Sequence, residues 1–357
     1  MKLPRLRLDP LTRKKLQRFR SIRRGYVSFL ILATAVVLSL AAELLVNSRA
    51  LVVRHEGQWH FPTYGRIHTG KEFGLDYAYE VNYRELQRKF AAEPAGKNWV
   101  LLPPVPYNPL ENCHPGETFR PRPPDWARQN FLGTDQINRD ILARLVYGFR
   151  NALAFAAAFL LLTYAVGISL GCLMGYFGGW FDLLVQRLIE IWSNIPFLFV
   201  VIIVASIVPA GIGMNLGVLL AIVVLFSWTG MTYYMRSATY REKARDYVHA
   251  AQVLGASTPR ILFRHILPNV LSTIVTFIPF TIASSISALT ALDFLGFGLP
   301  PPTPSWGELL RQGTSNLQSP WIVASAFSAL VLVLVLVTFI GEAIREAFDP
   351  KKFTLYQ

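Results

Sequence analysis

The chain has 357 residues, of which more than half are hydrophobic and only 16% are charged. A soluble domain usually carries about a quarter charged residues, so this composition excludes an ordinary soluble protein and indicates an integral membrane protein. The net charge of +13 does not indicate nucleic-acid binding, because the basic residues adjoin apolar segments and no recognition motif accompanies them.

The N-terminal segment is strongly basic. Ten of the first 24 residues are lysine or arginine, and Asp9 is the only acidic residue among them, so the positive-inside rule places the N-terminus in the cytoplasm. Six apolar segments follow, each long enough to cross roughly 30 Å of hydrocarbon. They lie at 26–45, 153–175, 189–208, 216–235, 270–292 and 321–341. Because the number of spans is even, both termini are expected in the cytoplasm.

These spans divide the chain into six parts, which we predict from the N-terminus onward. They are a basic cytoplasmic segment at 1–25, a first transmembrane helix at 26–46, an extracytoplasmic domain at 47–131, an interfacial amphipathic helix at 132–150, a five-helix core at 151–345 with a cytoplasmic loop at 237–268, and a cytoplasmic tail at 346–357. The predicted fold class is therefore an all-α integral membrane protein with a small outer domain between helices 1 and 2.

The predicted outer domain at 47–131 is rich in aromatic residues and proline. A disordered linker would be poor in aromatics, so we expect a small, loop-rich folded domain whose best helix candidate is 80–90. Four of the six histidines lie here, but their spacing matches no zinc motif. We therefore predict no metal site at His55, His60, His68 and His114.

Motifs for catalysis and nucleotide binding are missing from the sequence. The G-x-S-x-G pattern does not occur, and the Walker A pattern fails because Lys71 and Lys97 follow glycines but precede Glu72 and Asn98 instead of Ser or Thr. We expect a chain that is not an enzyme and binds no cofactor itself. Energy must then come from another chain or from an ion gradient.

Residues 132–150 carry an apolar stripe at helical spacing, with Asp140 and Arg144 four residues apart on the polar side. This pattern predicts an amphipathic helix that lies in the outer interface of the membrane.

The loop at 237–268 is polar and basic and separates two apolar spans. Tyr247, Ala250, Ala251 and Leu254 recur at i, i+3, i+4 and i+7, which predicts a helix from about Arg241 to Leu254 with one narrow face. Gly255 can end that helix in a left-handed cap. Two short helices joined at a glycine would fit a groove on another protein.

Small hydroxyl residues concentrate in the fifth predicted span. Thr273, Thr276, Ser284 and Ser287 could share one helical face and line a translocation pathway, because polar groups are costly in lipid and usually face the bundle or water. Packing of small hydroxyls between helices explains the same residues. The span carboxylates that a secondary transporter would use all lie toward span ends: Glu43, Glu190, Asp293 and Glu342.

The loop at 237–268 resembles the "EAA" loop of ATP-binding-cassette importer permeases, which inserts into a cleft of the ATPase subunit. The similarity rests on Ala250, Ala251, Gly255, Leu267 and Pro268, whereas His249 stands where the family motif has a glutamate. The resemblance implies a role in coupling to the ATPase for Tyr247, His249, Ala250, Ala251, Leu254, Gly255, Ala256, Leu267 and Pro268.

Two further resemblances narrow the family. The segment from Gly133 to Arg144 is similar to the G-T-D-x-x-G-R-D-x-x-x-R segment of the dipeptide, oligopeptide and nickel branch, with Asn138 in place of a glycine. The outer domain and the run from Asp293 to Pro300 look like the second permease subunit of the Yej-type peptide importer, a system associated with peptides and the antibiotic microcin C.

If the resemblance holds, the fold is the six-helix architecture of type I importer permeases in the bacterial inner membrane. A second homologous permease subunit, two ATP-binding cassette domains or subunits that bind ATP and Mg, a periplasmic substrate-binding protein and membrane lipid are then the expected partners. The expected cargo is peptides or peptide-like compounds such as microcin C. The alternatives are an ion-coupled secondary transporter, a permease for another cargo of the dipeptide and nickel branch, and a membrane-anchored sensor or enzyme.

Overall fold

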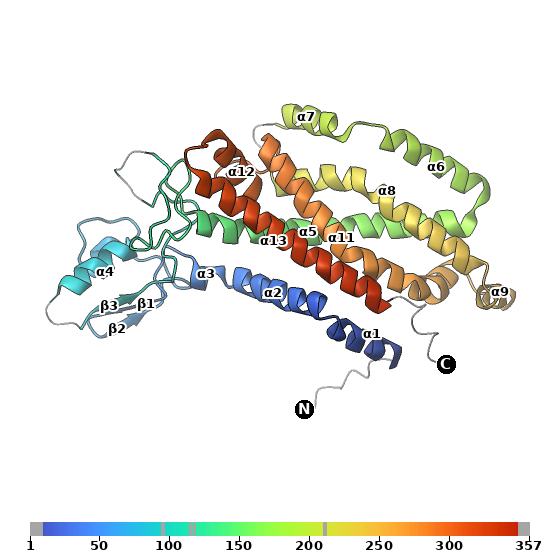
Figure 1. The fold of residues 1–357 in the computed structure, drawn as a ribbon, viewed down its shortest axis with the longest axis horizontal. Coiled ribbons are helices and arrows are strands. Elements are labelled where there is room, and N and C mark those ends of the chain that lie inside the picture. Colours follow the sequence, from blue (N-terminus) through green and yellow to red (C-terminus); the bar gives the residue numbers. More distant parts are fainter. Residues whose placement is uncertain (1–9, 94–96, 114–115, 117–118, 210–212, 349–357) are drawn as a thin grey trace.

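Long helices dominate the computed structural model, which describes residues 10–93, 97–113, 116, 119–209 and 213–348 (Figure 1). Five helices are long and apolar enough to cross a membrane: α2 (Arg23–Leu40), α5 (Ile141–Phe177), α8 (Leu216–Lys243), the continuous helix Thr258–Leu295, and α13 (Pro320–Phe348). They match five of the six predicted spans. The predicted cytoplasmic tail at 346–357 falls mostly outside the described residues, as does His114.

The sixth predicted span, at 189–208, is not one straight helix. It consists of the end of α6 (Gly179–Ser193) and of α7 (Phe197–Ile207), and the two helices are bent by 71°. Pro196 causes the break, because its ring removes a backbone donor and disfavours helical geometry at Ile195. With this bent pair taken as one span, the permease has the six predicted spans.

The closest helix pair in the bundle is α5 with α8, and glycines allow the approach. Gly167, Gly171 and Gly175 recur every fourth residue along α5. A Cβ at Gly171 would lie 2.5 Å from the carbonyl oxygen of Thr232, and a Cβ at Gly175 would lie 2.7 Å from that of Arg236. Small residues at this spacing let two helix backbones pack directly against each other.

The predicted interfacial helix at 132–150 does not form as a separate element. Residues 132–140 make turns, and helix α5 begins at Ile141 and continues into the membrane span without a break. The reason is local, since Gly133 and Asn138 adopt positive φ angles of 77° and 63°, and Asp140 accepts the capping hydrogen bond from the Ala143 N–H at 2.7 Å. Residues 141–150 are thus the outer turns of a span.

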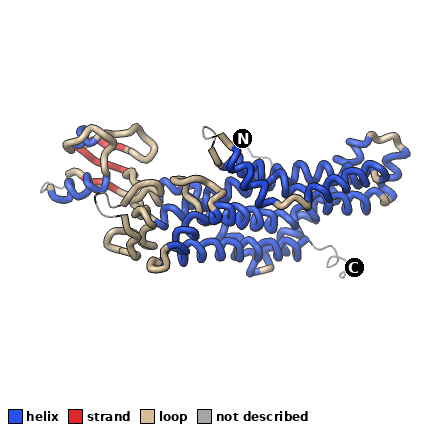
Figure 2. Tube along the Cα trace, turned by 90° about the horizontal axis from the view of Figure 1, so that it is seen from above, coloured by secondary structure: helices blue, strands red, loops and turns tan. Residues whose placement is uncertain are grey.

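The outer domain between the first two spans contains a small sheet, which the sequence analysis did not predict. Strands β1 (Val52–His55), β2 (Gln58–His60) and β3 (Trp99–Leu101) pair antiparallel in the order β2-β1-β3, at the end of the molecule away from the helical bulk (Figure 2). The β1–β2 turn has positive φ at both Glu56 and Gly57, as the preferred two-residue hairpin turns require.

One helix covers the inner face of this sheet. Helix α4 (Tyr83–Ala92) begins at Asn82, whose side chain accepts hydrogen bonds from two backbone N–H groups of the first turn. The core between helix and sheet consists of apolar side chains, including Val53, Phe73, Leu86, Phe90 and Val100. A short 3-10 helix (Gly70–Phe73) contributes the central phenylalanine.

Three short helices lie at the two ends of the first span and before the last span. Helix α1 (Pro10–Ser21) precedes the first span, α3 (Ala42–Leu45) follows it, and α12 (Trp306–Ser315) lies at the outer end of the bundle before α13 (Figure 1). The first span packs against the last, where a Cβ at Gly25 would lie 2.1 Å from the Cβ of Ala343.

Candidate functional site

The predicted loop at 237–268, which we call the docking loop, forms two helical pieces. The first piece is shorter than predicted. Helix α8 continues to Lys243, residues 244 and 245 break the helix, and α9 spans Asp246–Val253, so the single helix predicted from Arg241 to Leu254 is wrong. Gly255 has a φ of 77°. The Ala256 N–H donates to the Ala251 carbonyl at 3.0 Å and the Gly255 N–H to Gln252 at 2.9 Å, which is a Schellman cap.

After Gly255 the chain enters the next span through an unusual turn. Helix α10 (Thr258–Arg260) leads into a π-helical stretch, Ile261–Ile266, and then directly into α11 (Leu267–Leu295). Pro268 is the second residue of α11 but lies inside the continuous helix Thr258–Leu295, where its ring removes one intrahelical backbone donor. The loop therefore joins α11 without a flexible linker.

The residues predicted to form one docking face point in two directions. Val248 and Ala251 are buried against Ile261 and Ile266, so Ala251 belongs to the loop's own core. The exposed apolar side chains are Val253 at 87%, Leu254 at 85% and Phe263 at 70%. These three residues, which we call the apolar tip, are where another protein can bury hydrophobic surface. Sequence reasoning missed Val253 and Phe263, although both are apolar residues in an otherwise polar loop.

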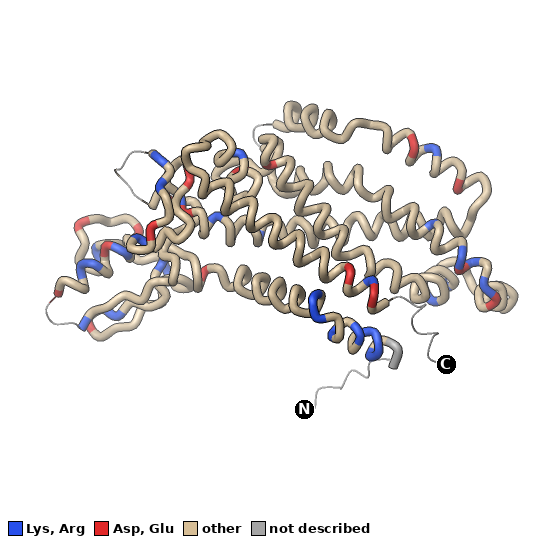
Figure 3. The backbone as a smooth tube through the Cα atoms, in the orientation of Figure 1, with Lys and Arg blue, Asp and Glu red and all other residues tan. Residues whose placement is uncertain are grey.

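The other predicted coupling residues surround the apolar tip. His249 and Ala250 are exposed, Tyr247 is at the edge of exposure and donates its hydroxyl to Glu242 at 2.8 Å, and Ala256 and Leu267 are partly buried against the loop core. Lysines and arginines cluster around α9 at this end of the molecule (Figure 3).

An ion pair anchors the base of the loop. Arg236 on α8 donates two hydrogen bonds of 2.5 Å to the carboxylate of Asp182 on α6, and the Tyr240 hydroxyl donates to the same carboxylate at 2.8 Å. The Asp182 side chain is 5% exposed and the Arg236 side chain 23%, so salt screens this bidentate pair less than it screens an exposed pair. It ties α6 to α8 close to the start of the loop.

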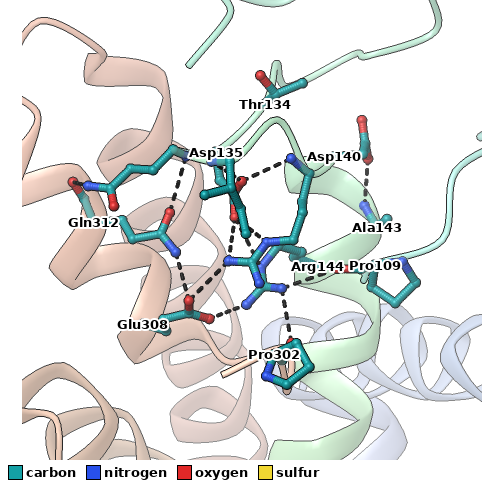
Figure 4. Close-up of polar contacts among 12 residues, drawn as sticks. Pro109, Thr134, Asp135, Asp140, Ala143, Arg144, Pro302, Glu308 and Gln312 are labelled. Atoms are coloured by element: carbon teal, nitrogen blue, oxygen red, sulfur yellow. Dashed lines mark hydrogen bonds and ion pairs between the residues drawn. The ribbon is translucent and has the colours of Figure 1, made fainter. Parts of the chain in front are cut away.

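At the opposite end of the bundle lies a buried network of charges (Figure 4). Arg139 donates to Asp135 at 2.7 Å and to Glu308 at 3.0 Å, and Arg144 donates to the other oxygen of Glu308. Gln312 completes the group by donating to Glu308 at 2.7 Å. We call these five residues the outer network; each is less than 9% exposed, and the two guanidinium groups balance the two carboxylates.

The outer network joins three parts of the chain. Asp135 and Arg139 lie in the turn before α5, Arg144 lies in α5 itself, and Glu308 and Gln312 project from α12. Arg144 also donates to the carbonyl oxygen of Pro109 in the outer domain at 3.1 Å. The Asp140 carboxylate, four residues before Arg144, accepts from Asn130 at 2.9 Å, and burial raises the pKa of Asp140 to about 6.

The mid-bundle cavity between α5, α8 and α11 has a volume of about 300 Å³. Ser284 lines it, but the other predicted pathway residues, Thr273, Thr276 and Ser287, do not. Among the described residues its lining contains no charged side chain, and its polar groups are hydroxyls: Thr163, Tyr164, Ser227, Tyr234, Thr281, Ser284 and Ser285. The Tyr164 and Thr281 hydroxyls lie 2.9 Å apart across it.

Comparison with known proteins decides the family. The model for "Binding-protein-dependent transport system inner membrane component" matches residues 167–354, which include the docking loop and the last three spans. The chain belongs to this family of importer permeases. It is a multi-pass protein of the inner membrane, and ATP hydrolysis is the task of separate ATPase subunits.

Individual relatives of this permease extend the similarity to the outer domain. The chain is 43% identical over 347 residues to an inner membrane ABC transporter permease protein, YejE, of Escherichia coli, covering 97% of this chain and 99% of that protein. It is 37% identical over 374 residues to a peptidoglycan transport system permease protein of Agrobacterium fabrum, covering 96% and 94%. An oligopeptide permease, OppC, of Lactococcus lactis is 36% identical over 228 residues, covering 63% of this chain and 76% of that protein.

The turn at Gly255 of the permease gives a prediction about the docking loop. No atom lies within 4 Å of a Cβ built at Gly255, so a substitution is strained only by its φ of 77°. Gly255→Val should shift the apolar tip and lower transport-coupled ATP hydrolysis about tenfold, because a β-branched residue is costly in this region by roughly 1–2 kcal/mol. Gly255→Asn is the matched control, since asparagine tolerates the left-handed region, and it should retain most of the activity. Equal activity of both variants would contradict this role of the turn.

Proposed function

We propose that this permease and a second, homologous permease subunit form the membrane pathway of an importer for peptides or peptide-like compounds. Two ATP-binding cassette domains or subunits bind ATP and Mg and dock at the apolar tip, and a periplasmic substrate-binding protein delivers the cargo. The observation that carries the proposal is the similarity over almost the whole chain, outer domain included, to a permease described as inner membrane YejE and to one described as a peptidoglycan transporter. Microcin C is one candidate among peptide-like cargoes.

A continuous helix supports the coupling role of the loop. The chain is helical from Ile261 through Leu295, so a displacement of the apolar tip is passed to α11 as a rigid element. At the outer end of α11 the carboxylate of Asp293 accepts from the Leu299 N–H at 2.7 Å and from the Ser305 hydroxyl. Ser305 in turn caps α12, which carries Glu308 of the outer network. ATPase closure below can thereby bias the outer end of the pathway.

The mid-bundle cavity supports a pathway suited to varied cargo. Its hydroxyls and aromatic rings provide weak, adaptable hydrogen bonding, and several of them donate to carbonyls of their own helix, as Ser284 does to Thr281 at 2.9 Å. An uncharged lining holds no cargo tightly, which favours release. We propose Ser284 as a pathway residue together with Thr273, Thr276 and Ser287 on the same side of α11.

Reconstitution tests the proposed function. Proteoliposomes that contain this permease, its partner permease, the ATPase subunits and the binding protein should accumulate a labelled oligopeptide when ATP is supplied. The permease alone should neither hydrolyse ATP above background nor accumulate peptide. Uptake driven by a proton or sodium gradient without ATP would instead support a secondary transporter.

The orientation of the permease is tested with an introduced cysteine. Burial raises the pKa of the native Cys113 thiol, which is 6% exposed, so this thiol is a poor reporter. Lys71→Cys places a thiol at an exposed position in the outer domain, and a membrane-impermeant maleimide should label it in intact spheroplasts. Arg13→Cys, on the cytoplasmic side, should be labelled only after the membrane is opened. The reverse pattern would overturn the topology.

A further inference from the structure

Helix α1 carries a concentration of positive charge directly before the first span. Its side chains include Arg13, Lys14, Lys15, Arg18 and Arg20, and Arg23 and Arg24 open α2. From residue 10 to residue 24 no acidic side chain interrupts this series. Figure 3 shows the resulting basic patch, well separated from the charges around α9.

One side of α1 is fixed to the cytoplasmic end of the last span. Phe19 is buried in a cluster with Ala343 and Ala347 of α13, and the Lys15 ammonium lies 4.8 Å from the ring centre of Phe348. Arg24 pairs with Glu342 at 3.4 Å. These contacts hold α1 beside the end of the bundle, where the apolar part of α13 gives way to charged residues.

Among the residues that the structure describes, none covers the other side of α1. Arg13, Lys14 and Arg20 are exposed, and the exposed apolar side chains of Leu16, Val27 and Phe29 lie on the same helices. Basic residues at the boundary of an apolar surface match the chemistry of the inner leaflet, whose anionic headgroups attract each nearby lysine or arginine. Helix α9, whose last residue belongs to the apolar tip proposed to dock the ATPase, lies apart from α1 (Figure 1).

We propose that α1 is a lipid-docking helix that binds the headgroups of anionic phospholipids in the cytoplasmic leaflet. The bound lipids stabilise the contact of α1 with the end of α13. This proposal goes beyond the proposed function, because it holds whatever cargo the permease transports.

Neutral substitutions on α1 test the proposal. The full-length permease is purified in a neutral detergent, and binding of phosphatidylglycerol and of phosphatidylcholine is measured by native mass spectrometry. A variant with Arg13→Gln, Lys14→Gln and Arg20→Gln keeps Arg23 and Arg24, which orient the first span. It should lose at least tenfold in affinity for phosphatidylglycerol and keep its weak binding of phosphatidylcholine.

A control variant removes the same charge from the outer domain. Lys71→Gln with Arg88→Gln and Lys97→Gln alters three exposed residues and should bind phosphatidylglycerol as the parent does. A charge-conserving variant, Arg13→Lys with Arg20→Lys, should also match the parent. Raising the ionic strength from about 0.05 to 0.5 M should release phosphatidylglycerol from the parent, because salt screens exposed charges.

Three results would overturn the proposal. One is binding of phosphatidylglycerol by the neutral α1 variant within twofold of the parent. Another is binding by the parent that does not change with ionic strength, and this measurement does not depend on the folding of any variant. An equal loss in the outer-domain control would likewise assign the binding to general charge and not to α1.

Discussion

Arg144→Met is expected to destabilise the folded permease by about 3–5 kcal/mol, because removing one partner leaves a buried charge uncompensated. Arg144 is fully buried and pairs with Glu308, and its loss would leave the Glu308 carboxylate short of a partner in the outer network. The measurement is the thermal unfolding midpoint of the purified permease, followed by tryptophan fluorescence, and we expect a decrease on the order of 10 °C.

Two further variants separate burial from charge. Arg187→Met breaks an exposed pair with Glu190 at 2.6 Å, in which the arginine side chain is 76% exposed, and should change stability by less than about 1 kcal/mol. Arg144→Met combined with Glu308→Met removes both charges and should recover part of the lost stability. If Arg144→Met and Arg187→Met unfold at the same temperature, the outer network does not stabilise this end of the bundle.

Leu254→Glu is expected to abolish stable association with the ATPase subunits. Leu254 is 85% exposed in the isolated chain, so the substitution leaves the permease folded. The interface with the ATPase would lose the free energy that burial of the leucine side chain contributes, about 1.5–3 kcal/mol. The glutamate would also place a desolvated charge in that interface. A loss of 2.8 kcal/mol or more corresponds to at least about a hundredfold in affinity, which co-purification from detergent detects.

A neighbouring substitution serves as the control for Leu254→Glu. Ala251 belongs to the same predicted helical face as Leu254, but it is buried inside the loop, so Ala251→Glu would damage the fold of the loop as well. Ser257→Glu adds the same charge at an exposed position outside the apolar tip and should leave association nearly unchanged. Association of Leu254→Glu at the parental level would remove the apolar tip as the docking surface.

Structural features that depend on local sequence patterns were predicted well. Runs of apolar residues located the spans, and the glycine at 255 adopts the expected left-handed turn. Patterns of this kind depend on residues a few positions apart. The inward direction of Ala251 depends on its packing in the cluster that contains Ile261 and Ile266, and periodicity carries no information about those partners.

Long-range pairing explains the remaining differences. The stripe before α5 has helical spacing, yet Asp135, Arg139 and Arg144 are directed to one another and to Glu308 on α12. A solvated or interfacial helix was therefore the wrong prediction for a segment whose polar residues are buried. In the docking loop, by contrast, the residues proposed to contact the ATPase are exposed. The role of this loop in coupling is a proposal.

The separation of Arg144 from Glu308 along the chain bears on how the permease is made. The two residues are 164 positions apart, so at a synthesis rate of roughly 5–20 residues per second the arginine is translated about ten to thirty seconds before its partner. During that interval Arg139 and Arg144 have only the Asp135 carboxylate of the outer network beside them, so this part of the chain carries an excess positive charge. A nascent or truncated permease that lacks α12 therefore differs from a finished one by an excess of positive charge at the outer end of the bundle, because it lacks the carboxylate of Glu308.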